Sequence, residues 1–506
     1  MRSTFMGLET SKRGMFTQQS ALYTTGHNIS NANTLGYSRQ RVNMEASLGY
    51  PGIGLNTPTT PGFIGTGVQA QSIERIRDTF IDRQFRQESS KLGYWESRSQ
   101  AITQMEDIMS EPSEFGLNES LNQFWNSLQD LSVNPENAGA RKVVVQRGIA
   151  VADSFNYIHK QLSDIQGNLK NEIRVSTDDI NSILDQIASL NEQIASIEPN
   201  GYLPNDLYDA RDNLLDELST YFPIELEYVK SGGNASKIAE GIVNVSIKTA
   251  GSPVNIVNGK DYAEMSTNLT TAEGYEDFGA FTFTANGSAT GGSISQNQLE
   301  ANKGKMLSLV NSYGYGPVDS EAGFYPDMLK DLNDMAKAFV TKFNTDHGNG
   351  FPLQGSANIS DFFDPAGLSA STIKVNGAII TDPGSVAASS SLNEEGNGAN
   401  ALKLANMKFA PLTIGTVPNT NIQTFYQSII GQLGVEGEQA GRLTYNSQTI
   451  KLSVENNRAS VSSVSLDEEM TNMIKFQQAY NASARMITVV DETLDKIING
   501  MGRVGL

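Results

Sequence analysis

A seven-residue apolar repeat between about residues 137 and 198 constrains the fold more than any other feature of this sequence. One heptad position holds Leu162, Leu169, Ile183, Leu190 and Ile197, interrupted only by Ser176, and a second holds Ile173, Ile180, Ile187 and Ile194. Such a repeat predicts one continuous helix, which Pro199-Asn200-Gly201 would end. At about 1.5 Å per residue this helix would reach roughly 90 Å, so we expect a rod-shaped molecule.

Both ends of the chain carry a narrower apolar stripe. Its members stand seven residues apart: Leu8, Met15, Leu22 and Ile29 near the N-terminus, and Leu466, Met473, Tyr480, Ile487 and Leu494 near the C-terminus. Because companion positions such as Lys12 and Gln19 are polar, the first stripe resembles a coiled-coil seam more than a core face. An isolated helix cannot bury its own seam. We therefore expect the stripes to pack against each other, against neighbouring subunits, or both.

The segment GHNISNANTLGYSRQR, residues 26–41, interrupts the first stripe. Asn31, Asn33 and Gly36 are residue types that tolerate left-handed backbone, so we expect them to end the first helix and turn the chain.

Between these ends the apolar period changes several times. Alternating apolar residues such as Val243, Val245 and Ile247 predict antiparallel β-structure in the middle of the chain. The predicted fold class is therefore α+β, elongated and multidomain, with terminal coiled-coil-like helices, a long-helix rod domain and β-rich middle and outer inserts. The expected parts are an N-terminal helix and turn (1–42), an extended linker (43–70), a helical rod domain (71–222), a β-rich region (223–320), a rod helix (321–346), a small β or loop-rich insert (347–400), further rod helices (401–460) and a C-terminal helix (461–506).

Composition argues against several classes of function. The chain has 37 basic and 56 acidic residues, a net charge of −19, so nucleic acid and anionic membrane surfaces would be repelled. It has no cysteine, and its three histidines are far apart in sequence, so we expect no disulfide, metal site or cofactor. An ordinary secretory signal and an apolar stretch of membrane-spanning length are both missing, which argues against membrane insertion.

Candidate catalytic groups are few. Asp361 and Asp364 could form an acid–base pair, but their polar context favours a solvated turn. His347 could act as a base, although a single histidine at a helix C-terminus is more often a partner of the helix dipole or a cap. We therefore predict that the protein is not an enzyme.

The segment 26–41 is similar to the ISN-x-NT-x-GYSRQ segment that follows the first helix in axial proteins of the bacterial flagellum, with Leu35 where proline often stands. Within that group, Ser38-Arg39-Gln40 after Gly36-Tyr37 resembles the hook-associated protein 1 family. Three further blocks agree with this resemblance and occur in the same order: residues 65–86, 206–219 and 466–499.

The resemblance implies a structural protein of the extracellular flagellum that is secreted unfolded through the flagellar type III export channel. It implies a homo-oligomeric ring between hook and filament, with paired terminal helices as its inner tube. The implied partners are the hook protein, a second junction protein, filament proteins and an export chaperone that binds the C-terminal region. The alternatives that the residues leave open are another axial protein of the hook or rod type, or an exported adhesin.

Two hypotheses concern assembly. The terminal stripe residues would contact neighbouring subunits, and the terminal segments would be largely disordered in the free monomer. Tyr37 and Arg39 would be surface anchors to neighbours, or they would simply pack locally.

Overall fold

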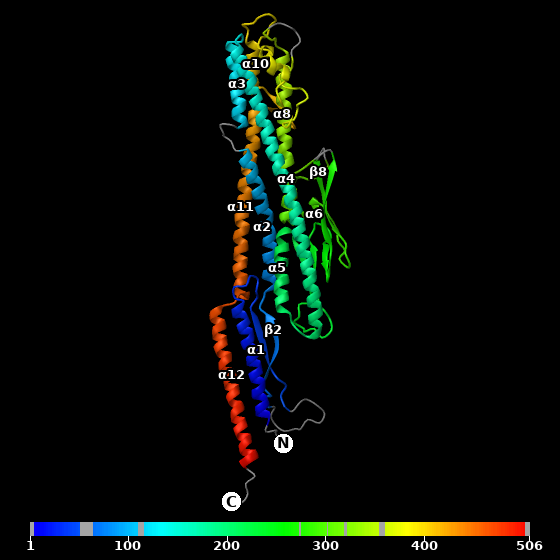
Figure 1. The fold of residues 1–506 in the computed structure, drawn as a ribbon, viewed down its shortest axis with the longest axis vertical. Coiled ribbons are helices and arrows are strands. Elements are labelled where there is room, and N and C mark those ends of the chain that lie inside the picture. Colours follow the sequence, from blue (N-terminus) through cyan, green and yellow to red (C-terminus); the bar gives the residue numbers. More distant parts are fainter. Residues whose placement is uncertain are drawn as a thin grey trace, which may run out of the picture.

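The protein is a long rod with both terminal helices at the same end (Figure 1). The computed structural model describes residues 5–50, 64–109, 116–272, 275–300, 302–317, 321–353 and 360–500. The elongated α+β architecture predicted from the sequence is confirmed.

Helix α4 is the backbone of the rod. It covers Ala138–Ile197, 60 residues, which confirms the long helix predicted from the repeat. Asn137 caps its first turn, since Asn137 Oδ1 accepts the N–H of Gly139 at 2.8 Å. Both heptad positions face the core, and their fully covered members are Leu162, Leu169, Ile173, Ile180, Ile183, Ile187 and Ile194.

Other helices complete the rod, most of them packed against α4 and the remainder against those helices. They are α2 (Thr79–Ile108), α3 (Leu117–Val133), α5 (Asn205–Tyr221), α7 (Lys305–Tyr313), α8 (Phe324–Gly348), α10 (Ala399–Ala405) and α11 (Ile422–Ser462), with a short α6 (Gln296–Leu299). Helix α11 lies along α2 through a seven-residue repeat of buried positions, Tyr426, Leu433, Ala440, Ser447 and Val454. Helix α7 lies inside the region expected to be β-rich (223–320) and belongs to the rod instead. It is too short for its period to be recognised in the sequence.

The end of the rod farthest from the termini is held by aromatic rings. Six phenylalanine and tryptophan side chains from α3, α8 and the following loop form one cluster: Phe124, Trp125, Phe339, Phe343, Phe362 and Phe363. The expected β or loop-rich insert (347–400) is loop-rich in its described residues. It contains the short helix α9 (Gly377–Thr381) and two isolated β-bridges, Phe351 with Ser389 and Phe363 with Val375. A small hairpin, β10 (Leu412–Ile414) with β11 (Val417–Thr420), follows it.

The middle of the chain forms two antiparallel sheets beside α4, as the alternation predicted. The first has the order β3 (Ile224–Val229), β4 (Ile242–Ile247), β5 (Val254–Asn258) and β6 (Asp261–Tyr262). The second has the order β7 (Glu264–Ala272), β8 (Tyr275–Thr284) and β9 (Gly292–Ile294).

Asparagine side chains on α4 attach these sheets to the rod. Asn181 Nδ2 donates to the Met265 carbonyl at 2.9 Å, and Asn181 Oδ1 accepts the Met265 N–H at 2.7 Å. Asn191 binds the N–H and carbonyl of Val243 in the same way, at 3.1 and 2.8 Å. Each asparagine amide thus forms the two hydrogen bonds that a neighbouring strand would form with that residue, so the backbone N–H and carbonyl of the residue remain paired.

At the terminal end, α1 (Met6–Ser30), α12 (Leu466–Asp495) and the hairpin of β1 (Gln40–Ala46) and β2 (Val68–Arg75) form a separate layer (Figure 1). A π-helical turn, Lys496–Gly500, follows α12. The expected boundaries at 42/43 and 70/71 fall inside the two paired strands, so the described parts of the expected linker (43–70) are arms of a hairpin. Residues 51–63 of that linker lie outside the described residues.

Candidate assembly interface

Helices α1 and α12 form an antiparallel pair. A Cβ added at Gly7 would lie 3.7 Å from the Val490 side chain, and one added at Gly14 would lie 3.2 Å from Ser483 Oγ. Nearer the rod, Asn28 meets Glu469. The two helices can approach closely because small residues occupy a heptad position of α1 along their contact.

The predicted stripe residues lie beside this contact and are only partly covered. Leu8, Met15, Leu22 and Ile29 of α1 are half-buried, and so are Met473, Tyr480, Ile487 and Leu494 of α12. Leu466 begins α12 and is exposed. The buried positions of α1 are instead Thr17, Ala21, Thr24, Thr25 and Asn28. Thr17 Oγ1 lies 3.1 Å from the Val68 carbonyl, so part of this polar face lies under the hairpin.

The small-residue position of α1 was not predicted from the sequence. Gly7, Gly14, Ala21 and Asn28 stand seven residues apart, which is a coiled-coil period without apolar side chains. The period was available in the sequence, but polar and small residues carry no hydrophobic signal.

Asn28 is the hub of the joint between the terminal helices and the rod. Its Nδ2 donates to the Gln40 carbonyl at 2.9 Å and to Glu469 Oε2 at 3.1 Å. Its Oδ1 accepts the Gln40 N–H at 3.0 Å and the Tyr37 hydroxyl at 2.8 Å. These four bonds use the hydrogen-bonding capacity of a buried amide fully. One side chain therefore ties α1, the following turn, β1 and α12 together.

Arg39 and Tyr37 both have partners within the chain. Arg39 Nε lies 2.8 Å from Glu469 Oε1, and Arg39 Nη1 lies 2.7 Å from Glu468 Oε2. The backbone N–H of Arg39 donates to the Ser462 carbonyl at 2.9 Å. Burial, reinforced by nearby carboxylates, raises the pKa of Tyr37, so its hydroxyl remains a donor to Asn28. This is the arrangement that the local-packing alternative describes, while a contact with neighbouring subunits stays a prediction.

The turn after α1 uses left-handed backbone at one of the three expected residues. Gly36 has φ +75°, whereas Asn31 has φ −101° and Asn33 is not among the described residues with positive φ. The helix ends at Ser30, as expected, but Asn31 ends it through side-chain hydrogen bonds, because its Nδ2 donates to the His27 carbonyl at 3.1 Å.

A buried charge network lies where the hairpin joins α2, α5 and α11. Among its closest contacts, Arg77 Nη1 lies 2.7 Å from Asp212 Oδ2, and Arg458 Nη1 lies 2.7 Å from Asp216 Oδ2. Burial alone would raise the pKa of Asp212, but the surrounding arginines outweigh it and hold that pKa well below its usual range. The network comprises Arg75, Arg77, Arg86, Arg211 and Arg458 with Asp82, Asp209, Asp212, Asp216 and Glu240.

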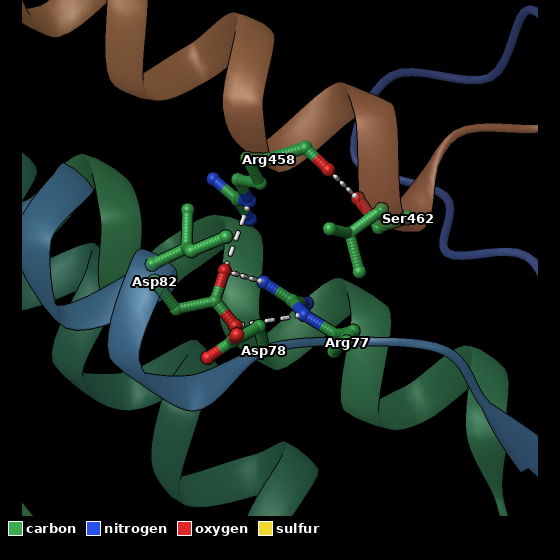
Figure 2. A pocket seen from close by; sticks show the side chains of 7 residues that line it. Arg77, Asp78, Asp82, Arg458 and Ser462 are labelled. Carbon is green, nitrogen blue, oxygen red and sulfur yellow. Dashed lines mark hydrogen bonds and ion pairs between the residues drawn. The ribbon is translucent and has the colours of Figure 1, made fainter.

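This network fixes the direction in which the terminal layer leaves the rod. Ser38 donates to Asp209 through its N–H at 3.0 Å and its hydroxyl at 2.7 Å. Figure 2 shows the side facing α11, where Arg77 and Arg458 both reach Asp82 around a shallow depression. Arg77, Arg458 and Asp82 are paired with one another there, and Asp78 caps α2 through the Phe80 N–H, so the depression has the character of a packed joint.

Two of the three candidate catalytic residues, His347 and Asp364, have structural partners. His347 is fully buried in the last turn of α8, and its Nε2 accepts the Ala387 N–H at 2.9 Å. Burial, with a contribution from Arg141, lowers the pKa of His347 to about 4, so it is neutral and does not act as a charged dipole partner. Asp364 accepts the Ala366 N–H at 2.9 Å and pairs with Lys374, as expected of a solvated turn.

Over the ranges that the structure describes, no three His, Asp or Glu side chains gather closely enough to hold a metal ion. Among the helices in those same ranges, none has both the length and the apolar composition that crossing a bilayer requires.

Comparison with known proteins agrees with an axial assembly. The family described as "Flagellar hook-associated protein FlgK helical domain" matches residues 102–363, and the family "Flagellar basal body rod FlgEFG protein C-terminal" matches residues 456–500. The chain is 45% identical to Flagellar hook-associated protein 1 of Bacillus subtilis, over 99% of both chains. It is 24% identical to the Escherichia coli protein of the same name, over 96% of this chain and 98% of the relative.

One solved structure has a similar fold. It is the flagellar hook junction protein FlgK from Burkholderia pseudomallei, with a TM-score of 0.60 and 12% sequence identity. The match covers 75% of this chain and 100% of the solved chain. At this identity the likeness supports the architecture alone.

Proposed function

The chain belongs to the flagellar hook-associated protein 1 family, and from that premise we propose that it is a structural subunit of the junction between hook and filament. Similarity over the whole chain favours this role over that of another hook or rod protein. The match to the basal-body rod family is confined to 45 C-terminal residues, 456–500, which include α12.

One observation carries the proposal: α12 is apolar on two sides, and α1 covers only one. Its outward-facing residues Met470, Ile474, Met486 and Val489 are each between 50 and 57% exposed. Several large apolar side chains exposed along one helix mark an interaction site. The missing cover would come from neighbouring copies in a ring.

The terminal stripe residues would take part in the same contacts. Leu8, Met15, Leu22 and Ile29, together with Met473, Tyr480, Ile487 and Leu494, would complete their burial against neighbours, and exposed Leu466 would do so from the start of α12. Tyr37 and Arg39 would support assembly by holding the joint, with Asn31, Asn33 and Gly36 in the turn. Because two antiparallel helices bury little surface, we propose that both remain largely disordered until assembly.

The family further supports an extracellular position on the flagellum. The proposed partners are the hook protein on one side, and a second junction protein and filament proteins on the other. We propose unfolded export through the type III channel with a chaperone on the C-terminal region, and no role as an enzyme.

Electron microscopy of a null strain tests the role. Cells without the protein should show bare hooks and release filament subunits into the medium, and the full chain should restore filaments. A chain lacking the last forty residues should fold in its rod domain but fail to restore them. Attached filaments in the null strain would contradict the proposal.

Hydrogen exchange on purified monomer tests the order of the termini. Residues 5–30 should exchange rapidly while α4 is protected. Strong protection of residues 5–30 in a true monomer would show that the termini fold without neighbours.

A further inference from the structure

The hairpin carries a second exposed apolar surface in the terminal layer. Met44, Leu48 and Tyr50 lie along one arm and are exposed, and Leu48 is 91% exposed. The arm is held in place, since the Ser47 N–H donates to the Gly67 carbonyl at 3.0 Å and Tyr50 forms a bridge with Ile64. An apolar side chain on an ordered strand loses little entropy when it is covered.

The hairpin and α12 contact α1 on different sides. In Figure 1 α1 stands between α12 and β2. Helix α1 packs against α12, β1 and β2. The terminal layer therefore has two separate apolar surfaces, the hairpin arm on one flank and the outward side of α12 on the other.

The two apolar surfaces lie at the same height along α1. Thr66 Oγ1 donates to the Leu48 carbonyl at 2.6 Å, and the next residue, Gly67, lies against Thr10. The contacts Gly7–Val490 and Gly14–Ser483 place Met486 at the height of Thr10. Leu48 and Met486 are thus at the same level on opposite flanks.

Charged side chains stand near both surfaces. Glu45 is exposed on the hairpin arm, and Lys475 and Arg485 are exposed on α12. In the described part of the chain, none of the three makes an ion pair. Strand alternation turns Glu45 to the face opposite Met44 and Leu48, so the apolar side chains, and not these charges, carry the contact.

We propose that the hairpin arm, residues 44–50, packs on the outward side of α12 of the next copy of this chain. The inference rests on the proposed function and names the two surfaces that form the subunit contact. Because the surfaces differ, the contact is heterologous: each copy gives its arm to one neighbour and its α12 to the other. Such contacts repeat around an axis and close into a ring when the rotation allows.

Cysteine cross-linking in assembled flagella tests this contact, because the chain has no cysteine of its own. The variant with both Leu48→Cys and Met486→Cys, treated with a short bis-thiol reagent, should give a ladder of dimers, trimers and larger products. Cells that co-express the two single variants should give dimers only, and Leu48→Cys alone should give none. A Gly14→Cys and Ser483→Cys chain, which links within one subunit, verifies that the reagent reaches the layer.

Cross-linked dimers from Leu48→Cys alone, or no ladder where the Gly14–Ser483 control reacts, would overturn the inference. If the protein is found at the junction without the ladder, only this contact is wrong. If the protein is not found at the junction at all, the proposed function itself fails.

Surface substitutions give a second test. Leu48→Asp should reduce the fraction of cells with attached filaments by roughly tenfold or more, the effect of losing one buried leucine at a contact. Leu35→Asp is the matched control, since Leu35 is 93% exposed but lies on the turn outside both surfaces. Equal effects of the two leucine substitutions would contradict the contact.

Discussion

Replacing Gly36 by alanine tests how the turn after α1 holds the joint. Gly36 has φ +75°, and a Cβ at this position would lie 1.8 Å from Asn213 Oδ1 on α5. Asn213 Nδ2 also donates to the Leu35 carbonyl at 3.4 Å. The substitution therefore creates two separate problems, a strained backbone and a side-chain overlap.

The backbone strain and the side-chain overlap each contribute to the free-energy cost of the substitution. Left-handed backbone costs an L-residue about 1–2 kcal/mol. Asn213 can rotate away from the new methyl group, but it then gives up its hydrogen bond, at about 1 kcal/mol. Gly36→Ala should thus destabilise the closed turn by about 2–3 kcal/mol. In an Asn213→Ala background the second contribution is already absent, so the same change should cost only about 1–2 kcal/mol.

Native-state hydrogen exchange on the full chain measures this locally. The amides of Ser38 and Arg39 are suitable reporters, because they donate to Asp209 and to the Ser462 carbonyl across the joint. Their opening free energies should fall by the amounts given above. If Gly36→Ala leaves both amides unchanged, or if its cost is the same with and without Asn213, the account of the turn is wrong.

Three further predictions concern other buried polar groups. Asn28→Leu should cost about 3 kcal/mol or more at the joint, because Glu469 keeps its charge and loses a donor; in assembled flagella, where the terminal helices are ordered, hydrogen exchange in α12 should rise, and no rise there would contradict the hub. Arg458→Gln should loosen the last turn of α11 by about 1–3 kcal/mol, visible as faster exchange there, while Arg458→Lys should retain part of the protection. For His347 the folded-state pKa, about 4, lies below its ordinary value of 6.5, so the unfolded chain binds a proton first as pH falls. Stability should therefore be complete above pH 6.5 and decline by about 3 kcal/mol toward pH 4. His347→Gln, which keeps an acceptor for the Ala387 N–H, should remove that contribution to the pH dependence of urea unfolding.

The long helix was predictable because its signal is local. Residues 162, 169, 183 and 190 repeat at a fixed spacing, and no distant partner is needed to specify a helix of that length. Helix α7 and the hairpin of β1 and β2 were not predictable in this way. The first is too short to show a period, and the second becomes a hairpin only because two segments separated by 21 residues, 47–67, pair with each other.

The assembly site was predicted only in part. The apolar stripes of α1 and α12 follow from spacing, yet the helices meet along Gly7, Gly14 and Asn28. Glycine and asparagine carry no burial signal of their own, and their role depends on the helix that lies opposite. Tyr37 and Arg39 stood out in the sequence, but their partners, Asn28 and Glu469, could not be assigned from it.

The sequence by itself determined where the long helices run, where the chain turns at Gly36, and that apolar ridges near both ends need cover. These properties depend on residues within a few turns of one another. Only the tertiary structure decided which polar groups pair across the joint, since five arginines and five carboxylates from distant segments can combine in many ways. Packing also decided which side of α12 remains exposed, because a helix with two apolar faces specifies neither as the inner one.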